Sequence, residues 1–337
     1  MNKKSIMISG VTGQMGAVLA EKYLADGYKV YGLRRRCSVF NTERVNHILH
    51  DPHVDDRFEL IYADLADYST LAKAIAKTQP EIFINCAAQS HVRVSWEIPE
   101  YTMDITGTGV LRCLEAIKNN SPGTKFIQCS SSEMFGGAPP PQNENTPFDP
   151  KSPYAVAKIA GYYMTRHYRE AFNLCASNAI MFNYEGTTRG LTFVTRKITM
   201  GCARIKLGLQ DYLYLGNSKS KRDWSSVDDS SNALMLMAAA DDPDDYCICT
   251  GDTHSVQELV EFTFGLAQLD WKKHIKTDQR YFRPTEVDVL LGDASKIRNK
   301  LGWEPTCTFQ QLITEMYQSD LSIAKKEKLI LSSGESC

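Results

Sequence analysis

The sequence predicts a doubly wound α/β fold, in which helices cover both faces of a parallel sheet. Two observations predict it: short apolar runs alternate with helical patterns through the first half of the chain, and a glycine-rich turn follows the first apolar run. Such alternation implies right-handed crossovers between parallel strands. The predicted strands are residues 5–9, 29–33, 58–62, 82–86, 125–130 and 175–182. The predicted helices between them are residues 14–26, 67–78, 99–118 and 153–172.

The second half of the chain is less regular and predicts a smaller, mixed α/β C-terminal lobe that binds substrate. Its helical patterns lie near residues 194–208, 228–240, 255–267, 293–301 and 308–322. We therefore expect a cofactor-binding domain at 1–184, to which part of the later chain returns, and a substrate lobe at 185–323. Residues 324–337 mix a short charge run with Ser and Gly, which predicts a frayed tail.

Composition and charge narrow the class of protein. With 337 residues, of which 43% are hydrophobic and 23% charged, the chain can bury a large core, which excludes intrinsic disorder, collagen and fibrous repeats. Lys and Arg total 38 against 40 Asp and Glu, so the net charge of −2 argues against nucleic acid as a partner. No stretch is long enough to span a bilayer, and we expect a cytoplasmic protein without membrane contact. The 10 cysteines lack the paired spacing of metal ligands, so we expect them reduced, with no metal bound.

Residues 10–16, GVTGQMG, form a glycine pattern between the first predicted strand and the first predicted helix. Gly10 permits a tight turn, Gly13 lets the backbone approach a pyrophosphate, and Gly16 lets helix and strand pack closely. The N-terminus of the helix then faces the anion. This context predicts a dinucleotide site whose loop residues are Gly10, Thr12, Gly13, Gln14, Met15 and Gly16.

Arginines at the end of the second predicted strand indicate which dinucleotide binds. The chain has Arg34, Arg35 and Arg36 where a site for NAD offers an acidic residue, and arginine suits a 2′-phosphate through paired hydrogen bonds. We therefore predict NADP, held by Arg35 and Arg36, over the alternative of a solvated charge run. The remaining cofactor candidates follow the third and fourth strands: Asp64, Leu65 and Ala87.

Tyr154 and Lys158 lie four residues apart at the start of a predicted helix, which places both side chains on one face. A phenol with a pKa near 10 is a base at neutral pH only where a neighbouring ammonium stabilises its phenolate. Ser131 and Glu133 follow the fifth strand, at the edge where open α/β sheets bind ligands. Together the four residues supply a base, its activating cation, a hydroxyl and a second acid–base group. The alternatives are a surface pair on the helix and a solvated Glu133.

Several strings of residues add a resemblance to a known family. The glycine loop, the Tyr154/Lys158 pair and the stretch Asn-Cys-Ala-Ala at 85–88 resemble extended short-chain dehydrogenases/reductases, which have a Rossmann fold. Within these, the chain is similar to the GDP-mannose 4,6-dehydratases to about residue 322. The strings that carry this similarity are RRxxxFNTER (35–44), AAQSHV (87–92), SSSEMFGG (130–137), SPYAVAK (152–158), GLTFVTRKI (190–198), KRDW (221–224) and YFRPTEVDVLLGD (281–293).

The resemblance implies roles for individual residues. Ser131 takes the position of the family's active-site hydroxyl, Glu133 that of its catalytic carboxylate, and Tyr154 and Lys158 those of the redox pair, which also contact the cofactor. The implied reaction converts GDP-mannose or a related GDP-sugar to the GDP-4-keto-6-deoxy sugar, with NADP as a cofactor that is regenerated in each turnover. The implied substrate-binding residues are Ser90, Ser131, Glu133, Asn183, Val194, Lys197, Arg222, Arg283 and Glu286.

Three segments depart from the family's pattern. Met15 replaces an acid in the glycine loop, and residues 183–190 and 225–228 differ from the family's usual strings. The departures leave the catalytic residues intact but leave the sugar open, so a GDP-heptose or another GDP-hexose stays an alternative to GDP-mannose. A GDP-sugar reductase or epimerase of the same family is the nearest alternative enzyme, and a cofactor-binding protein without catalysis is an alternative of another class.

The resemblance also implies self-association. Helices at 99–118 and 153–172 match those that pair between subunits in such enzymes, and residues 35–44 resemble a loop that reaches a neighbouring subunit. We therefore expect a homo-oligomer, a dimer or a tetramer.

Overall fold

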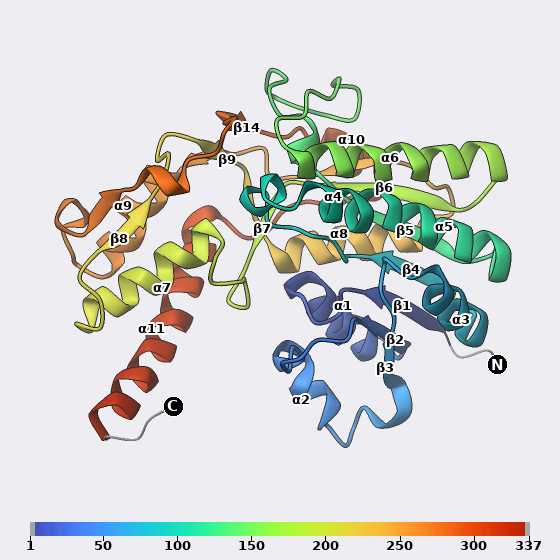
Figure 1. Cartoon of the computed structure of the whole chain (residues 1–337), viewed down its shortest axis with the longest axis horizontal. Helices are drawn as coiled ribbons and strands as arrows, with labels where there is room; N and C mark the ends of the chain where they lie inside the picture. Colours follow the sequence, from blue (N-terminus) through green and yellow to red (C-terminus); the bar gives the residue numbers. More distant parts are fainter. Residues whose placement is uncertain (1–3, 334–337) are drawn as a thin grey trace.

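The computed structural model describes residues 4–333 and is built around a seven-stranded parallel sheet (Figure 1). In spatial order the strands are β11 (Tyr246–Ile248), β6 (Ala176–Met181), β5 (Lys125–Ser131), β4 (Ile82–Asn85), β1 (Ser5–Ser9), β2 (Lys29–Arg34) and β3 (Phe58–Tyr62). The order reverses between β1 and β4, and ligands of open α/β sheets bind at such a switch point. The predicted doubly wound α/β fold is confirmed.

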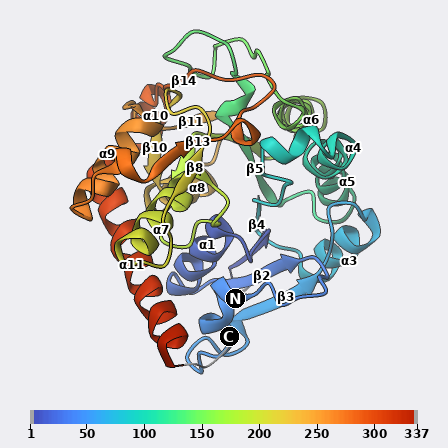
Figure 2. The ribbon, with the colours of Figure 1, turned by 60° about the vertical axis from the view of Figure 1, so that its left-hand side comes forward.

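Alternating side chains along the strands divide the core into two layers. Ile6 and Ile8 of β1 are fully buried in the layer on one face of the sheet, whereas Met7 between them is fully buried in the layer on the other face. The helices on the Ile6 side are α1 (Gln14–Ala25) and α8 (Val227–Ala239), and those on the Met7 side are α3 (Tyr68–Thr78), α5 (Gly109–Asn120) and α6 (Pro153–Phe172). Figures 1 and 2 show these helices on the two sides of the sheet.

The helix predicted at 99–118 is divided in the structure. It consists of α4 (Pro99–Met103), a π-helical turn (Asp104–Thr108) and α5. A β-carbon at Gly107, inside this turn, would lie 3.2 Å from the carbonyl oxygen of Ala157 in α6. The wide turn therefore lies where this segment packs closely against α6.

After β6 the chain leaves the sheet, and it returns at β11, which pairs with β6. The carboxylate of Asp245, just before β11, accepts hydrogen bonds from Arg169 at the end of α6 and from both the backbone and the side chain of Asn178 in β6. These contacts join three segments that are far apart in the sequence. Two short helices complete this part of the fold: α2 (Asn46–Leu49) and α10 (Ser295–Leu301), the latter packed beside β11.

A C-terminal lobe has its own core and carries helices α7 (Val194–Lys206), α9 (Val256–Leu266) and α11 (Phe309–Ser333). Figure 2 shows them on the side of the molecule away from α5 and α6. Short strands outside the seven-stranded sheet pair with one another in and beside this lobe. They are β8 (Leu213–Leu215) with β13 (Ile275–Thr277), β7 (Asn183–Glu185) with β10 (Trp224–Ser226), and β9 (Lys221–Arg222) between β12 (His254–Ser255) and β14 (Val289–Leu290). The mixed character of the lobe agrees with the prediction, because β12 is antiparallel to β9 while the other pairs are parallel.

The end of the chain differs from the frayed tail expected from residue 324. Helix α11 continues to Ser333 because it is fixed to α7: Ala324 is fully buried, and Glu327 forms a bidentate ion pair with Arg204 at 3.0 Å. Asp320, one helical turn before Ala324, accepts hydrogen bonds from Arg196 and Thr199. The last four residues of the expected tail, 334–337, lie outside the described residues.

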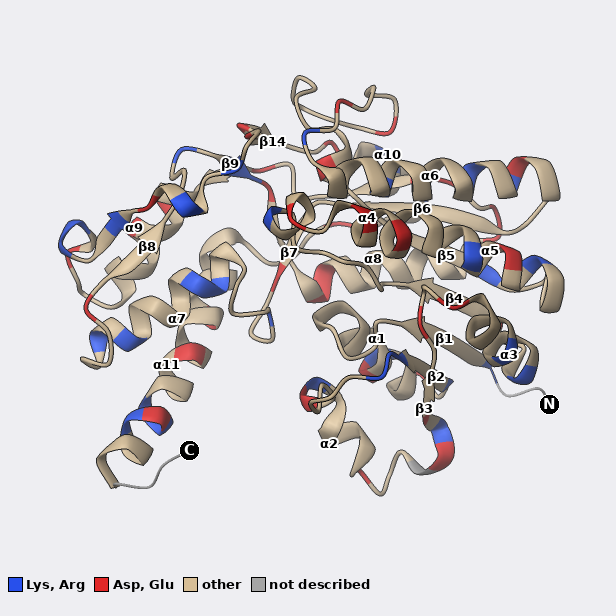
Figure 3. Ribbon diagram, viewed as in Figure 1, with Lys and Arg blue, Asp and Glu red and all other residues tan. Residues whose placement is uncertain are grey.

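Charges of both signs are interspersed over the helices and loops, as Figure 3 shows, without separation into a basic and an acidic half. Within residues 4–333, no helix is both long and apolar enough to cross a membrane. The nine cysteines in that range are all free, and the same range contains no group of three or more His, Cys, Asp or Glu side chains placed to hold a metal ion.

Candidate active site

The β1–α1 turn has the close backbone contacts that the glycine pattern predicts. Gly10 has φ +64°, and a β-carbon there would lie 3.0 Å from Cα of Ala87 at the end of β4. A β-carbon at Gly16 would lie 2.4 Å from the carbonyl oxygen of Gly10. Gly13 precedes α1 and no side chain caps the helix, so backbone N–H groups of its first turn remain available to a ligand.

A cavity of about 520 Å³ lies over this turn, at the carboxyl ends of β1 to β4. The side chain of Gln14 is buried at its wall; its Nε2 donates to the carbonyl of Tyr184 at 3.4 Å, and its Oε1 has no partner. The structure brings these predicted cofactor residues to this first cavity: Gly10, Thr12, Gly13, Gln14, Met15, Gly16, Arg35, Asp64, Leu65 and Ala87.

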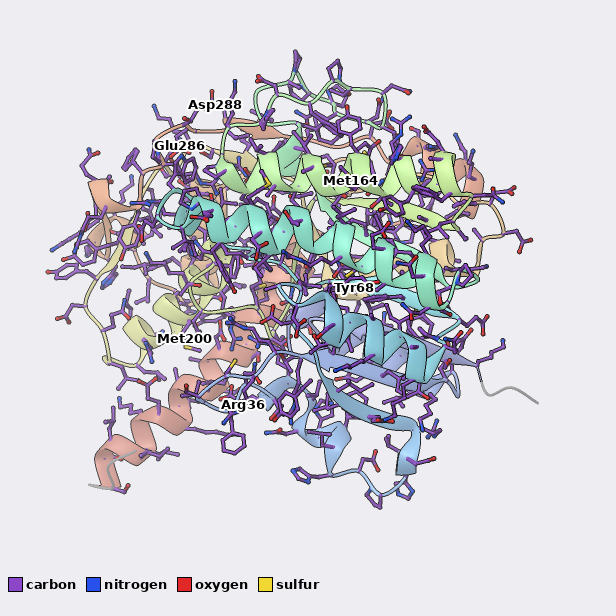
Figure 4. All side chains as sticks on the ribbon, turned by 45° about the vertical axis from the view of Figure 1, so that its right-hand side comes forward. Arg36, Tyr68, Met164, Met200, Glu286 and Asp288 are labelled. Carbon is purple, nitrogen blue, oxygen red and sulfur yellow. The ribbon has the colours of Figure 1, made fainter. Side chains whose placement is uncertain are left out.

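The arginines near β2 do not all reach the first cavity. Arg35 lines it, and its Nη1 donates to the hydroxyl of Tyr101 at 3.3 Å. Arg34 also lines it and stacks over the ring of Tyr62 at 4.4 Å. Arg36 is exposed (Figure 4) and is not among the residues that line either cavity. Of the predicted Arg35/Arg36 pair, only Arg35 therefore lines the first cavity.

Arg44 lines the first cavity, although the sequence analysis did not select it as a ligand. Its Nε donates to the carbonyl of Thr188 at 2.7 Å and its Nη1 to that of Thr12 at 3.3 Å. Burial, and then the Arg196 guanidinium nearby, lower the pKa of Arg44. Arg44 is the last residue of the string RRxxxFNTER (35–44), from which only self-association was predicted. The same string therefore contained a signal for this cavity residue.

A second cavity, of about 630 Å³, adjoins the first, since Ser90, Tyr184 and Arg189 line both. It lies over the carboxyl ends of β5 and β6 and extends to the C-terminal lobe. The predicted catalytic and substrate residues that line it are Ser90, Ser131, Glu133, Tyr154, Lys158, Asn183, Val194, Lys197, Arg222, Arg283 and Glu286.

Four side chains from β5, the turn that follows it and α6 form the predicted catalytic group. Ser131 ends β5, and its Oγ accepts a hydrogen bond from the backbone of Glu133 at 3.2 Å. Ser152 caps α6 by accepting from the backbone of Ala155, which fixes the start of the helix that carries the tyrosine and the lysine. Tyr154 and Lys158 are both buried one helical turn apart.

Lys158 is oriented by the backbone of the neighbouring strand. Its Nζ donates to the carbonyl of Cys129 at 2.5 Å and lies 5.8 Å from the centroid of the Tyr154 ring. The positive charge is thus held beside the phenol, which is the arrangement that stabilises a phenolate.

Glu133 forms an ion pair with Arg283, 150 residues later in the chain, with Nη1 to Oε1 at 3.2 Å. The backbone of Arg283 in turn donates to Glu286 at 2.9 Å. Arg222 is buried at the same wall, where its Nη1 donates to the carbonyl of Val287 at 2.9 Å. Burial lowers the pKa of Arg222 to about 10, although the nearby Glu133 opposes this. Two of the guanidinium groups that line this cavity, those of Arg222 and Arg283, therefore lie near the carboxylate of Glu133.

Other charged and aromatic groups extend the wall toward α7. The Nζ of Lys197 lies 3.3 Å from the centroid of the Tyr281 ring, and burial lowers the pKa of this lysine. Arg189 stacks at 3.6 Å over Phe193 and pairs through Nε with the buried Glu185 at 3.0 Å. Arg189 was not predicted as a ligand; it lies in segment 183–190, which the sequence marked as a departure from the family pattern.

The chain matches known proteins over almost its whole length. The family model described as "GDP-mannose 4,6 dehydratase" matches residues 7–316. The chain is 48% identical to GDP-mannose 4,6 dehydratase 1 of Arabidopsis thaliana, covering 98% of this chain and 94% of the relative. It is 44% identical to GDP-mannose 4,6-dehydratase of Vibrio cholerae, covering 97% of this chain and 96% of the relative.

Solved structures support the fold. The dTDP-glucose 4,6-dehydratase of Bacillus anthracis, solved in complex with NAD, superposes with a TM-score of 0.82 at 22% identity, covering 96% of this chain and 98% of that one. At this identity the similarity shows the Rossmann-type fold alone. The full-length sequence match shows the family, and the chain therefore belongs to the GDP-mannose 4,6-dehydratase family.

Proposed function

We propose that this protein converts GDP-mannose, or a closely related GDP-sugar, to the GDP-4-keto-6-deoxy sugar by an internal oxidation and reduction with loss of water. The observation that carries the proposal is the joining of the two cavities. Ser131, Glu133, Tyr154 and Lys158 line one cavity together, and that cavity opens into the one above the glycine turn. Redox chemistry and acid–base chemistry can therefore act on one substrate.

NADP is the cofactor that fits the first cavity. The glycines allow close backbone packing in the turn beneath the cavity, Gln14 lines the cavity with its Oε1 unpartnered, and Arg35 and Arg44 bring positive charge to the end of β2. Asp64 is the one carboxylate among the described residues that line this cavity, and it follows β3 rather than β2. When bound, NADP⁺ would accept a hydride from the sugar carbon C4 and its reduced form would return it to C6. The similarity to a dehydratase solved with NAD supports a nicotinamide cofactor in general, and the arginines support the 2′-phosphate.

The protein's own residues perform the proton transfers. Tyr154 takes the proton of the sugar O4 hydroxyl while Lys158 stabilises the phenolate, and the Ser131 hydroxyl donates to O4. Oxidation at C4 acidifies the hydrogen at C5, which Glu133 removes as a proton. Glu133 then protonates the departing C6 hydroxyl, so that water leaves and the carboxylate is regenerated. Delivery of the hydride to C6, with return of the proton held by Tyr154 to C5, directly or through solvent, leaves the ketone at C4 and regenerates the phenolate.

The arginines of the second cavity suit the diphosphate of the substrate. Guanidinium groups bind phosphate oxygens in pairs, and Arg222 and Arg283 come from separate segments of the C-terminal part. In the structure Arg283 is paired with Glu133, so substrate binding exchanges this carboxylate for phosphate and frees Glu133 for proton transfer. The residues that we assign to the rest of the nucleotide sugar are Ser90, Asn183, Val194, Lys197 and Glu286.

We also propose that the protein functions as a homo-oligomer. Helix α6 packs on α4 and α5 and exposes Val156, Tyr163 and Phe172 on its outer side, while Met103 is exposed on α4. A row of exposed apolar side chains on adjacent helices favours pairing with a second copy. We divide the work of the subunit between a cofactor-binding part at 1–184 and a substrate-binding part at 185–323, although α8 and β11 of the later part pack with the sheet.

Incubation of the purified protein with GDP-mannose alone tests the proposed reaction. The protein as purified, with no nicotinamide added, is expected to form a product with the alkali-dependent absorbance of a 4-keto sugar. Consumption of one NADPH for each sugar converted would instead identify an external reductase, and a C4-inverted sugar without loss of water would identify an epimerase. A screen of GDP-hexoses and GDP-heptoses in the same assay then identifies the sugar.

A further inference from the structure

Two cysteines lie side by side on the floor of the second cavity. The parallel register pairs Asn85 of β4 with Gln128 of β5, and the next residue on each strand is a cysteine, Cys86 and Cys129. Their sulfur atoms are 3.7 Å apart. Adjacent strands in a sheet are about 4.7–4.9 Å apart, which lies within the Cα separations that a disulfide can bridge.

Both cysteines belong to the residues that line the site, although Cys129 itself is buried. Cys86 is half-buried and lines both cavities, and Cys129 lines the second. The hydrogen bond with Cys86, and the nearby ammonium of Lys158, lower the pKa of Cys129, which favours its thiolate form, whereas the same hydrogen bond and burial raise the pKa of Cys86, which therefore keeps its proton. A thiolate is the reactive nucleophile of cysteine chemistry. Geometry and reactivity therefore coincide at this pair.

The second close pair of cysteines in the described chain lacks these features. Cys247 and Cys249 are fully buried, line neither cavity, and have their pKa values raised by burial. They follow one another along one segment, whereas Cys86 and Cys129 face one another across two strands. The comparison separates packing cysteines from a reactive pair.

We propose that Cys86 and Cys129 form an oxidisable dithiol that a peroxide converts reversibly to a disulfide. The Cys129 thiolate attacks one oxygen of hydrogen peroxide, the O–O bond breaks, and a sulfenic acid and hydroxide form. The Cys86 sulfur then attacks the sulfenic sulfur, and the sulfenic oxygen leaves as water with the thiol proton. Two thiols and one peroxide thus give one disulfide and two waters.

Disulfide formation would alter the catalytic cavity. The sulfur atoms must close from 3.7 Å to about 2.05 Å, which requires both cysteine side chains to rotate and the residues that carry them to adjust. The carbonyl of Cys129 holds Lys158, so a shift of this residue moves the ammonium that stabilises the Tyr154 phenolate. Since a displacement of about 1 Å in a catalytic group can cost on the order of 100-fold in rate, we expect oxidation to reduce turnover at least tenfold.

The test uses the full-length protein treated with hydrogen peroxide, blocked with N-ethylmaleimide and digested without reductant. Mass spectrometry is expected to find one linked peptide that joins residues 86 and 129 and is two hydrogens lighter than the reduced pair. Dithiothreitol is expected to remove the link and restore turnover. Cys86→Ser and Cys129→Ser, or the corresponding alanine variants if one serine variant does not fold, should each lose the link and the reversible part of the inactivation.

Cys175→Ser and Cys307→Ser are matched controls, because both residues are partly buried and lie outside the two cavities. These variants should form the 86–129 link as the parent does. Sulfinic acid on single cysteines without a linked peptide would overturn the proposal, as would a linked protein with undiminished turnover. Because the peptide map needs no substrate, its result is independent of the reaction proposed above.

Discussion

The two cavities are built in different ways, although they adjoin. The first depends on backbone: Gly10, Gly13 and Gly16 lie within one short turn and work by having no side chain. The second depends on side chains that come from distant segments, such as Glu133 and Arg283, which are 150 residues apart. From this difference we expect that cofactor binding is lost when atoms are added to the glycine turn, whereas turnover is lost when single functional atoms are removed from the second cavity.

The largest expected effect comes from removing one oxygen atom in the second cavity. Tyr154→Phe keeps the ring but removes the hydroxyl that accepts the O4 proton, so kcat should fall by about 10²- to 10⁴-fold. Steady-state kinetics with GDP-mannose measures the loss, and bound NADP should be retained. Tyr214→Phe, at an exposed tyrosine that lines neither cavity, is the control and should keep full activity. Equal rates for both variants would mean that Tyr154 is not the base.

The next effect comes from adding one methyl group beneath the first cavity. Gly16→Ala places a β-carbon 2.4 Å from the Gly10 carbonyl and 2.6 Å from Cα of Val11, so the turn must shift. We expect a loss of about 1–3 kcal/mol in the free energy of unfolding, as for overpacked cores, together with loss of bound NADP. Denaturant unfolding and the nucleotide content of the purified protein measure the two effects.

Gly265→Ala is the matched control for this substitution. Gly265 is exposed within α9, and an added β-carbon there meets nothing within 4 Å. Alanine in a helix interior is favoured over glycine by about 1 kcal/mol, so this variant should be more stable than the parent. If both variants changed stability in the same direction, the close contact at Gly16 would not be the cause.

A smaller effect should separate two neighbouring arginines. Arg35→Ala removes a guanidinium from the first cavity and should weaken NADP binding about tenfold, since a charge-assisted hydrogen bond contributes about 1.5–3 kcal/mol and this one is partly exposed. Arg36→Ala should leave the affinity unchanged, because Arg36 lies outside the cavity. Calorimetric titration of the nucleotide-free protein with NADP and with NAD gives both affinities. Losses of equal size would show that the loop rearranges when NADP binds.

The smallest effect concerns pH. Burial, and then the positive charge of Arg283, lower the pKa of His91 in the folded protein below its ordinary value near 6.5. The unfolded chain therefore binds this proton more readily, and the free energy of unfolding should decrease as the pH falls through about 6.5. His91→Gln should flatten this part of the pH profile, and Arg283→Gln should raise the pKa of His91 measured by NMR. If the pH profile of the free energy of unfolding and the pKa of His91 stayed unchanged in these variants, Arg283 and His91 would not be coupled.

Short-range patterns explain how much of the fold could be predicted. Six of the seven strands of the sheet and the glycine turn follow from apolar runs and from spacing within a few residues, and the structure places the ends of these six strands within one residue of the predicted ranges. The seventh strand, β11, was not predicted. The extension of α11 to Ser333 could not be predicted in this way, because it depends on contacts of Glu327 with Arg204 and of Asp320 with Arg196 in α7. Contacts between distant segments leave no local pattern.

The candidate site shows the same limit. Tyr154, Lys158, Ser131 and Glu133 could be selected because each lies in a short string at the end of a predicted strand or the start of a helix. The ion pair between Glu133 and Arg283, and the contact between Cys86 and Cys129, join separate strings and became visible only in the structure. The difference between Arg35, which lines the first cavity, and Arg36, which does not, likewise became visible only in the structure.

The central claim is that both cavities act on one sugar within one turnover, and isotope transfer tests it most directly. The protein is incubated with an equal mixture of GDP-mannose carrying deuterium at C4 and GDP-mannose labelled uniformly with carbon-13. The account predicts that deuterium appears at C6 of the 4-keto product only in molecules without carbon-13, because the hydride removed from a sugar returns to the same sugar. Deuterium at C6 of the carbon-13 product, or its loss to solvent, would contradict the account.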